Sequence, residues 1–147
     1  TMITPVARLT SEYLVVVEGR FPRERGRFVH WMAWDSRQRL QRACAPDDAG
    51  AWQAEANYEV QERFGRATLL VVRLITGRRN QIRLHCQLTG HPLVGEPLYR
   101  MTDPTIPFPR QALHAARLAF DHPTTGTRLE VTSPLPPDLA GLLDSLR

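Results

Sequence analysis

Apolar and polar residues alternate along most of the chain in short runs, a pattern that predicts a protein built mainly from strands. Residues 14–17 form an apolar, mostly β-branched run that ends at a glycine turn, as expected of a short buried strand. Residues 28–34 alternate loosely and predict a second strand, which an Arg- and Gln-rich segment follows over residues 36–42. After a loop at residues 45–50, the half-buried pattern of residues 55–63 and the apolar run of residues 67–75 predict two strands that form a hairpin.

The hydrophobic period changes from two to about 3.6 after Thr76-Gly77, which predicts a helix. Such a helix has an apolar and a basic face, made of Ile82, Cys86 and Leu88 and of Arg79, Arg83 and Gln87 respectively. Gly90, with Pro92 close behind, is expected to end it as a left-handed cap.

The C-terminal part returns to strands after a loop. Residues 96–110 are rich in proline, residues 113–120 and 128–132 predict strands joined by a turn at 123–126, and residues 137–146 predict a short helix. Strand pairs with intervening helices predict an α+β fold with a mostly antiparallel mixed sheet and flanking helices. The length of 147 residues is that of one domain.

Composition adds a basic surface to this picture. The 19 basic residues are all arginines and face 15 acidic residues, which gives a formal net charge of +4 and a pI of about 9.8. A high genomic GC content explains an arginine bias without any functional meaning, and composition alone favours that interpretation. Guanidinium groups also suit bidentate phosphate contacts and stacking on bases, so the alternative interpretation, a polyanionic partner such as a nucleic acid, is retained.

Composition and cysteine usage also exclude several classes. An apolar fraction of 42% with 23% charged residues excludes a disordered chain. No run approaches the roughly 18 apolar residues of a membrane-spanning helix, and residues 1–10 lack the charged-then-apolar order of a signal peptide. Cys44 and Cys86 are too few for a disulfide framework and lack metal-ligand spacing, so the sequence predicts a cytoplasmic protein without a metal site.

The segment TGRRNQIRLH, residues 76–85, carries the clearest candidate chemistry. It places a glycine turn between a buried strand and a helix, so that free backbone amides at the helix start would meet three arginines. Amides, helix dipole and guanidinium groups all favour negative charge, which predicts an anion-binding site. Arg83 stands out because it lies between Ile82 and Leu84, where a charge must be paired or reach a cleft. The competing interpretation is a solvated basic helix face.

Other candidate groups have plainer explanations. His91, in the segment GHPLVGEPLY (residues 90–99), is expected to be a hydrogen-bonding loop residue, and His114 a buried structural histidine. A hydrolase built on Cys86 with His85 or His91 is weakly supported, because adjacent residues of a helix point to different faces and a cysteine on an apolar face usually belongs to the core.

Several ordered motifs together resemble one protein family. They are YLVVVEG (residues 13–19), TGRRNQIRLH, GHPLVGEPLY, ALHAARLAF followed by His-Pro, and SPLPPDL. Their order and separations, from about Arg8 to Leu139, are similar to the C-terminal two thirds of an RluA-family RNA pseudouridine synthase. The resemblance implies a pseudouridine synthase-like α+β fold, here incomplete, with residues 1–147 forming the C-terminal part of the catalytic domain. It also implies isomerisation of uridine to pseudouridine in ribosomal or transfer RNA by base flipping, without metal or cofactor.

The resemblance assigns roles to individual residues. Tyr13 matches the tyrosine that packs against the flipped uracil, and Arg83 matches the arginine that pairs with the catalytic aspartate. These two are the expected catalytic residues. The expected RNA-binding residues are Arg78, Arg79, Asn80 and Gln81. Further arginines expected to meet the RNA backbone are Arg20, Arg23, Arg25, Arg37 and Arg39.

One element of the family pattern has no counterpart. The nucleophilic aspartate of the family lies in a His-Arg-Leu-Asp segment upstream of the tyrosine motif, and these 147 residues contain no such segment. Residues 7–11 include Arg-Leu without an aspartate and do not replace it. We therefore expect a pseudouridine synthase whose nucleophile comes from outside these residues, so that the chain alone is inactive. The alternative is a non-catalytic RNA-binding module that keeps the sheet and the basic cleft.

Overall fold

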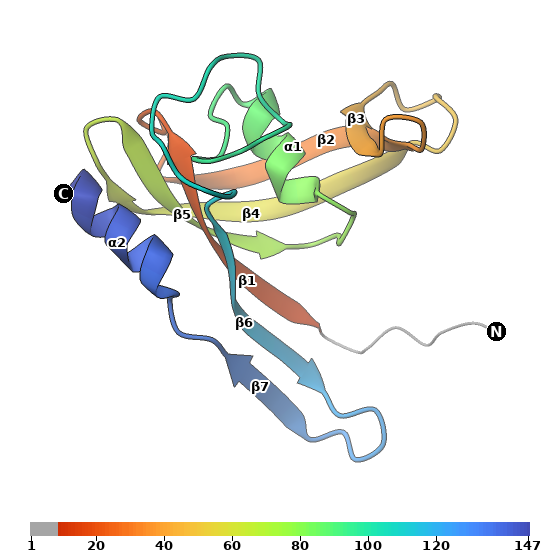
Figure 1. Cartoon of the computed structure of the whole chain (residues 1–147). Coiled ribbons are helices and arrows are strands. Elements are labelled where there is room, and N and C mark those ends of the chain that lie inside the picture. Colours follow the sequence, from red (N-terminus) through yellow and green to blue (C-terminus); the bar gives the residue numbers. More distant parts are fainter. Residues whose placement is uncertain (1–8) are drawn as a thin grey trace.

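A seven-stranded sheet flanked by two helices forms the protein, as seen in a computed structural model that describes residues 9–147 (Figure 1). The elements are β1 (Thr10–Glu18), β2 (Arg25–Asp35), β3 (Leu40–Ala43), β4 (Trp52–Arg63), β5 (Ala67–Leu74), α1 (Gln81–Leu88), β6 (Leu113–Asp121), β7 (Arg128–Thr132) and α2 (Pro137–Leu146). The strands lie in the order β3-β2-β4-β5-β1-β6-β7, and every neighbouring pair is antiparallel. The predicted α+β class and the two hairpins, β4–β5 and β6–β7, are confirmed. The expectation about a signal peptide falls largely on residues 1–8, outside the described ones.

The first strand lies deep in the sheet, between β5 and β6, and its alternate side chains supply two separate cores. Val15 and Val17 pack in one cluster with Ile82 of α1. Val16 packs in the other with Leu142 of α2. Figure 1 shows α1 and α2 on opposite sides of the sheet accordingly. Because β1 is covered on both faces, its sequence is a continuous apolar run rather than an alternating one.

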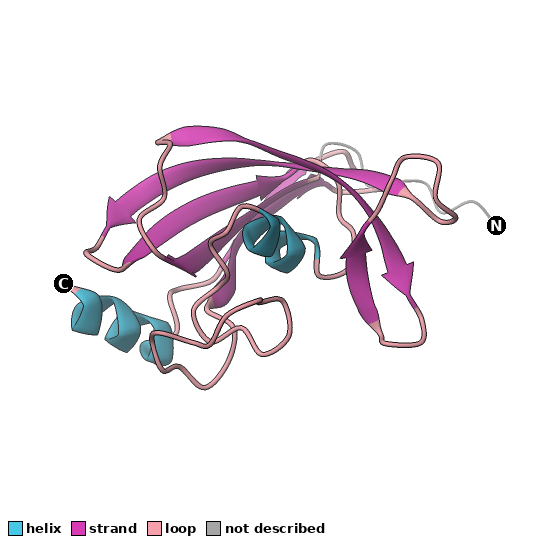
Figure 2. Ribbon diagram, turned by 90° about the horizontal axis from the view of Figure 1, so that it is seen from above, coloured by secondary structure: helices cyan, strands magenta, loops and turns pink. Residues whose placement is uncertain are grey.

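Strands β2 and β4, which pair with each other farther along the sheet, are covered on one face only. In β4, Ala54, Ala56 and Tyr58 are buried, whereas Gln53 and Asn57, at alternate positions, are exposed. The buried side faces α1, which lies within the curve of the sheet (Figure 2). This face, beyond the ends of α1, is where the candidate functional side chains gather.

The Arg- and Gln-rich segment after β2 differs from the prediction, because part of it forms strand β3. The Asp35 carboxylate accepts hydrogen bonds from the backbone amides of Arg37 and Gln38, and Arg39 adopts a left-handed conformation with φ 57°. This tight turn folds β3 back against β2. A polar sequence is tolerated there because β3 is the edge of the sheet.

The helix also begins later than the pattern predicts. Asn80 is left-handed, with φ 57°, so α1 starts at Gln81 and both Arg78 and Arg79 belong to the preceding loop. Leu88 is 40% exposed rather than part of the apolar face. Six residues separate it from Ile82, and at 3.6 residues per turn it lies far around the helix from that residue. The left-handed Gly90 after the helix is confirmed, with φ 83°.

Candidate functional site

A small pocket of about 150 Å³, hereafter the Tyr13 pocket, lies on the α1 side of the sheet. Its lining residues are Tyr13, Leu74, Arg78, Asn80, Gln81, Ile82, Arg83, Gln111 and Leu113. Apolar side chains from β5, α1 and β6 make part of the wall, and polar side chains from the loop before α1, from α1 itself and from the segment before β6 make most of the rest. Of the six predicted site residues, this pocket brings together all but Arg79.

Tyr13 lines the pocket from β1, next to a local irregularity in the sheet. Its side chain points to the same face as Val15 and packs, partly buried, against the first core cluster. The register between β1 and β6 shifts at this point, so that Glu12 pairs with Arg117 but Tyr13 pairs with Ala115. The residue without a partner is Ala116 of β6, and such a bulge bends the strand that contains it.

Arg83 is held by a carboxylate that the sequence reasoning did not identify. Its Nε and Nη2 atoms donate to the two carboxylate oxygens of Glu96 at 2.7 and 2.6 Å. The Arg83 side chain is 11% exposed and that of Glu96 is 0% exposed. The expectation that this arginine is paired or reaches a cleft is thus met on both counts, since it also lines the Tyr13 pocket. An acidic residue in the otherwise apolar segment GHPLVGEPLY was the signal that could have revealed it.

Both charges of this buried pair are stabilised by their surroundings. Burial acts to raise the pKa of Glu96, but hydrogen bonds from Arg83 and from the backbone amides of Leu98 and Tyr99 outweigh it and hold this pKa below its usual value. The hydrogen bonds to Glu96 raise the pKa of Arg83, against the effect of burial. The guanidinium therefore stays charged in a fixed orientation.

Arg83 keeps donor capacity on the side away from Glu96. A guanidinium has five N–H groups, and Glu96 takes one from Nε and one from Nη2. Nη1 lies 3.4 Å from the Asn80 side-chain oxygen, at the wall of the pocket. The edge formed by Nη1 and Nη2 can donate two hydrogen bonds to a second carboxylate in the bidentate manner.

Gln81 is a positioning residue at the rear of the pocket. It is 2% exposed, and its side-chain oxygen accepts from the Thr76 hydroxyl and the Arg78 amide, both at 2.9 Å. Its side-chain nitrogen donates to the Glu55 carbonyl at 3.0 Å and to Nε2 of His85 at 3.1 Å. With all four hydrogen bonds in use, Gln81 fixes the loop that carries Arg78, and direct contact with a ligand would require one bond to break.

The bond from Gln81 also determines the protonation of a buried histidine pair. Because Nε2 of His85 accepts a hydrogen bond from the Gln81 side-chain amide, the neutral His85 ring carries its own proton on Nδ1, which lies 2.7 Å from Nδ1 of His30. Nδ1 of His30 is then the acceptor. Burial, followed by the neighbouring His30, lowers the pKa of His85 to about 3, and burial lowers that of His30.

The remaining predicted arginines do not form one patch. Arg79 turns away from the Tyr13 pocket, and its guanidinium lies 4.5 Å from the ring centre of Trp34. Arg20, Arg23 and Arg25 precede or begin β2, whereas Arg37 and Arg39 follow its other end. The eleven residues of β2 put about 30 Å between the two groups.

The other histidines and the buried cysteine have structural surroundings. His91 donates from Nδ1 to the Glu18 carbonyl at 2.9 Å, as expected of a loop residue. His114 donates from Nε2 to the Ser133 carbonyl at 3.1 Å but is half-buried, so the prediction that it is buried is wrong. Cys86 is 0% exposed, and burial raises the pKa of its thiol, so this thiol is not an accessible nucleophile.

Two kinds of reactive group, a pocket aspartate and a metal-binding cluster, are not found in the part of the chain that the structure describes. Within residues 9–147, no aspartate lines the Tyr13 pocket, and no three His, Cys, Asp or Glu residues gather closely enough to hold a metal ion. Neither of the two described helices is long and apolar enough to cross a membrane.

Comparisons with known proteins all point to one family. A family model described as RNA pseudouridylate synthase matches residues 4–88. The chain is 39% identical over 139 residues to an uncharacterized RNA pseudouridine synthase of Bacillus subtilis, covering 95% of this chain and 45% of that protein. It is 46% identical over 101 residues to the ribosomal large subunit pseudouridine synthase D of Nitrosomonas europaea, covering 64% of this chain and 29% of that protein. The chain thus spans less than half the length of these relatives.

Solved structures agree with the sequence comparisons. Human RNA pseudouridylate synthase domain containing 1 superimposes with a TM-score of 0.73 at 26% identity, covering 95% of this chain and 66% of the human chain. Human RNA pseudouridylate synthase domain containing 4 superimposes with a TM-score of 0.75 at 16% identity, which shows a shared fold.

Proposed function

Because the chain belongs to the RNA pseudouridylate synthase family, as its RluA-like motifs predicted, we propose that it is the C-terminal part of a catalytic domain that isomerises uridine in RNA to pseudouridine. The observation that carries this proposal is that Tyr13 and Arg83, from distant parts of the sequence, line one small pocket. The RNA would be ribosomal or transfer RNA. A cytoplasmic location accords with the two unpaired cysteines, Cys44 and Cys86.

In this proposal the target uridine leaves its stack and places its uracil in the Tyr13 pocket. A volume of about 150 Å³ is smaller than the ~300 Å³ at which small-molecule sites begin, so the pocket suits one ring rather than a larger ligand. The Tyr13 ring provides a face for the base, and Leu74 and Ile82 provide apolar walls.

Arg83 is proposed to orient the nucleophilic aspartate, which a segment outside these 147 residues supplies. The Nη1–Nη2 edge of its guanidinium would bind the aspartate, while Glu96 holds the Nε–Nη2 edge. A guanidinium at this position favours the ionised form of an incoming carboxylate. The aspartate then attacks the sugar or the base, and the glycosidic bond to N1 breaks. The uracil turns and its carbon five bonds to the sugar, the bond to the aspartate breaks so that the carboxylate is released, N1 takes up a proton, and the proton of carbon five is lost to solvent.

A non-catalytic RNA-binding module is the second candidate function. The observation that favours it is that no described aspartate borders the Tyr13 pocket. In that case the pocket would bind an unpaired base without changing it.

A chimera separates the two candidates. These residues replace the matching 139-residue region of the Bacillus subtilis relative, which keeps its own upstream segment. Tritium release is measured from RNA labelled at carbon five of uridine and isolated from a strain that lacks this relative, with the parent protein as the positive control. We expect release by the chimera, a loss of at least about 100-fold in Tyr13→Ala and Arg83→Ala chimeras, and no release by the 147-residue chain alone.

Three outcomes would change this conclusion. A folded chimera that binds RNA but releases no tritium, while the parent does, favours the non-catalytic module. Release by the 147-residue chain alone overturns the proposal that the nucleophile lies outside it. A Val131→Ala chimera, altered at an exposed position of β7, should match the unmodified chimera, and an equal loss there would show that the Tyr13 and Arg83 effects are not local.

A further inference from the structure

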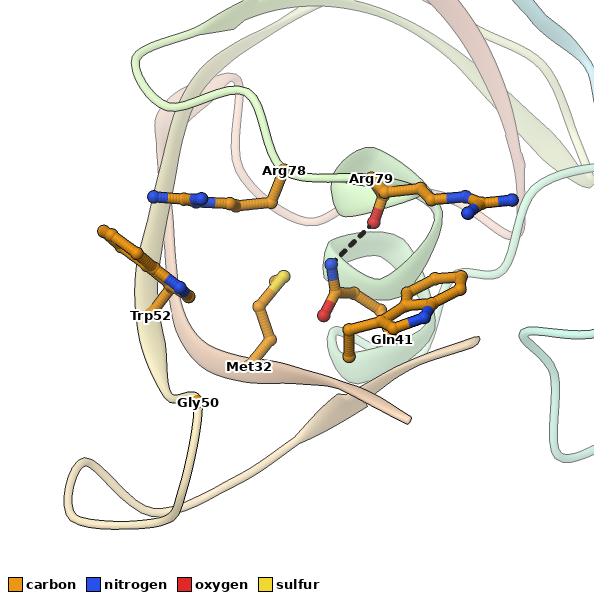
Figure 3. A pocket seen from close by; sticks show the side chains of 7 residues that line it. Met32, Gln41, Gly50, Trp52, Arg78 and Arg79 are labelled. Carbon is orange, nitrogen blue, oxygen red and sulfur yellow. Dashed lines mark hydrogen bonds between the residues drawn. The ribbon is translucent and has the colours of Figure 1, made fainter. Parts of the chain in front are cut away.

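A second and larger pocket, hereafter the tryptophan pocket, lies beside the Tyr13 pocket and is not used by the proposed reaction. It encloses about 340 Å³, at the lower end of the range for small-molecule sites. Its lining residues are Met32, Trp34, Gln41, Gly50, Trp52, Arg78 and Arg79 (Figure 3). Arg78 lines both pockets, so the two are neighbours.

Sheet register brings the two tryptophans together. Met32 and Trp34 alternate along β2 and so share a face, Trp52 of β4 is the direct partner of Met32, and Gln41 of β3 is the partner of Trp34. Met32, at 1% exposed, forms the floor. Figure 3 shows Trp52 beside Met32, with the Arg78 side chain above Trp52 and the Arg79 side chain extending in the opposite direction.

The arginines are fixed in place but their charges are not neutralised. The Gln41 side chain donates to the Arg79 carbonyl at 2.8 Å and so ties the loop to β3. The Arg78 guanidinium lies 3.4 Å from the ring centre of Trp52, and that of Arg79 lies 4.5 Å from that of Trp34. Within the described residues neither guanidinium forms an ion pair, in contrast to Arg73 of β5 and Arg117 of β6.

An exposed tryptophan beside uncompensated guanidinium groups is an unusual surface for a protein to keep. Trp52 is 54% exposed, although its ring is large and apolar. Flat rings and cations together suit a ligand that has both an aromatic face and a negative charge. Nucleotides combine these properties, and unpaired bases stack on aromatic and guanidinium planes in single-stranded RNA recognition.

We propose that the tryptophan pocket binds an unpaired base of the RNA adjacent to the target uridine. The inference rests on the proposed function, because it places the target base in the Tyr13 pocket and its neighbour in the tryptophan pocket. The phosphate that joins the two nucleotides would lie at Arg78, the side chain common to both pockets. The substrate is then a loop or single strand in which two successive bases are unstacked, rather than a regular duplex.

Binding of three matched RNAs to the 147-residue chain tests the proposal. Each has the same number of phosphates and an abasic sugar at every position, except that the second carries one central uridine and the third two adjacent uridines. Fluorescence polarisation measures the affinities at one salt concentration. The first uridine reports the Tyr13 pocket and the second reports the tryptophan pocket, so the two failures are distinguishable.

We expect the second uridine to raise the affinity of the unmodified chain by about 5- to 100-fold, as one stacked base does. Trp52→Ala should remove this gain and leave the gain from the first uridine unchanged, whereas Trp52→Phe should keep most of the second gain. Tyr13→Ala should remove the first gain. Val131→Ala, at the far edge strand, is the matched exposed control and should behave as the unmodified chain.

The proposal is overturned if Trp52→Ala keeps the full gain from the second uridine, or if Val131→Ala loses it as well. It is also overturned if sedimentation shows a dimer that Trp52→Ala dissociates while RNA does not respond, because a second copy of the chain would then cover this face. If the first uridine gives the unmodified chain no gain in affinity but the second does, the result counts against the proposed function and not against the tryptophan pocket.

Discussion

The buried histidine pair predicts that the protein loses stability in mildly acidic solution. His85 is 0% exposed, and burial together with the neighbouring His30 lowers its pKa from 6.5 to about 3. The unfolded chain binds a proton on this ring below about pH 6.5, whereas the folded chain does so only near pH 3, so the unfolded state is favoured as the pH falls through this window. Each pH unit costs ~1.4 kcal/mol, and His85 alone costs about 2 kcal/mol at pH 5.

The hydrogen-bond geometry explains why the folded pair resists the proton. Nε2 of His85 is occupied by the Gln81 amide, and a single hydrogen lies between the two Nδ1 atoms. A proton added to Nε2 of His85 or to Nδ1 of His30, the two acceptor nitrogens, would place two donors opposite each other. The buried carboxylates of Glu18 and Glu96 have pKa values below the usual 4.5, so they contribute to acid sensitivity only at lower pH.

Urea titrations at pH 7.5 and pH 5 measure the effect as a difference in the free energy of unfolding. His85→Asn keeps a side-chain donor and acceptor but cannot titrate, so we expect lower stability at pH 7.5 and a difference between the two pH values that is smaller by about 2 kcal/mol. His122→Gln, in the turn between β6 and β7, is the control and should keep the difference of the unmodified protein. The reasoning is refuted if His85→Asn loses as much stability between these pH values as the unmodified protein.

Three further predictions concern the buried ion pair, a crowded glycine and RNA binding. Glu96→Gln leaves its arginine partner uncompensated and should lower the free energy of unfolding by about 3 kcal/mol in urea titrations; a loss below about 1 kcal/mol would contradict the importance of the pair. In Gly95→Ala the backbone has a φ of +75° and the new Cβ collides with the Arg110 carbonyl, so the free energy of unfolding should fall by about 3 kcal/mol. For Gly126→Ala, where φ is +72° but the space is open, it should fall by about 1 kcal/mol. Affinity for single-stranded RNA should fall steeply with salt, and Arg79→Gln should reduce the log–log slope by about 0.7; an unchanged slope would exclude a phosphate contact at this residue.

The sequence predicted the elements best where a single physical pattern controls them. The apolar runs that became β1 and β5 are buried whatever their neighbours are, and the alternation in β4 reflects one covered face. Edge strand β3 was missed because a polar edge strand carries no such pattern. The start of α1 was misplaced because Asn80 is left-handed, and its side chain is held by a tertiary contact, a hydrogen bond to the Tyr99 hydroxyl, that no local pattern reveals.

The candidate site shows the same division. The family resemblance was needed to select Tyr13, and the motif at residues 76–85 supplied Arg78, Arg79, Asn80, Gln81 and Arg83. The motif could not show that Arg79 faces another pocket, because one peptide unit within a loop turns neighbouring side chains in opposite directions. Glu96 was overlooked, since only the folded chain reveals which acid meets a buried arginine.

The sequence by itself therefore determined the fold class and the family, because both depend on local hydrophobic patterns and on the order of motifs along the chain. The tertiary structure alone decided the pairing of Arg83 with Glu96, the neutral state of the His30–His85 pair and the placement of Trp34 and Trp52 around one pocket. These features depend on sheet register and on burial, which set distances and solvent access between residues that are far apart in the chain. Electrostatic and stacking energies depend on those two quantities, and no local pattern encodes them.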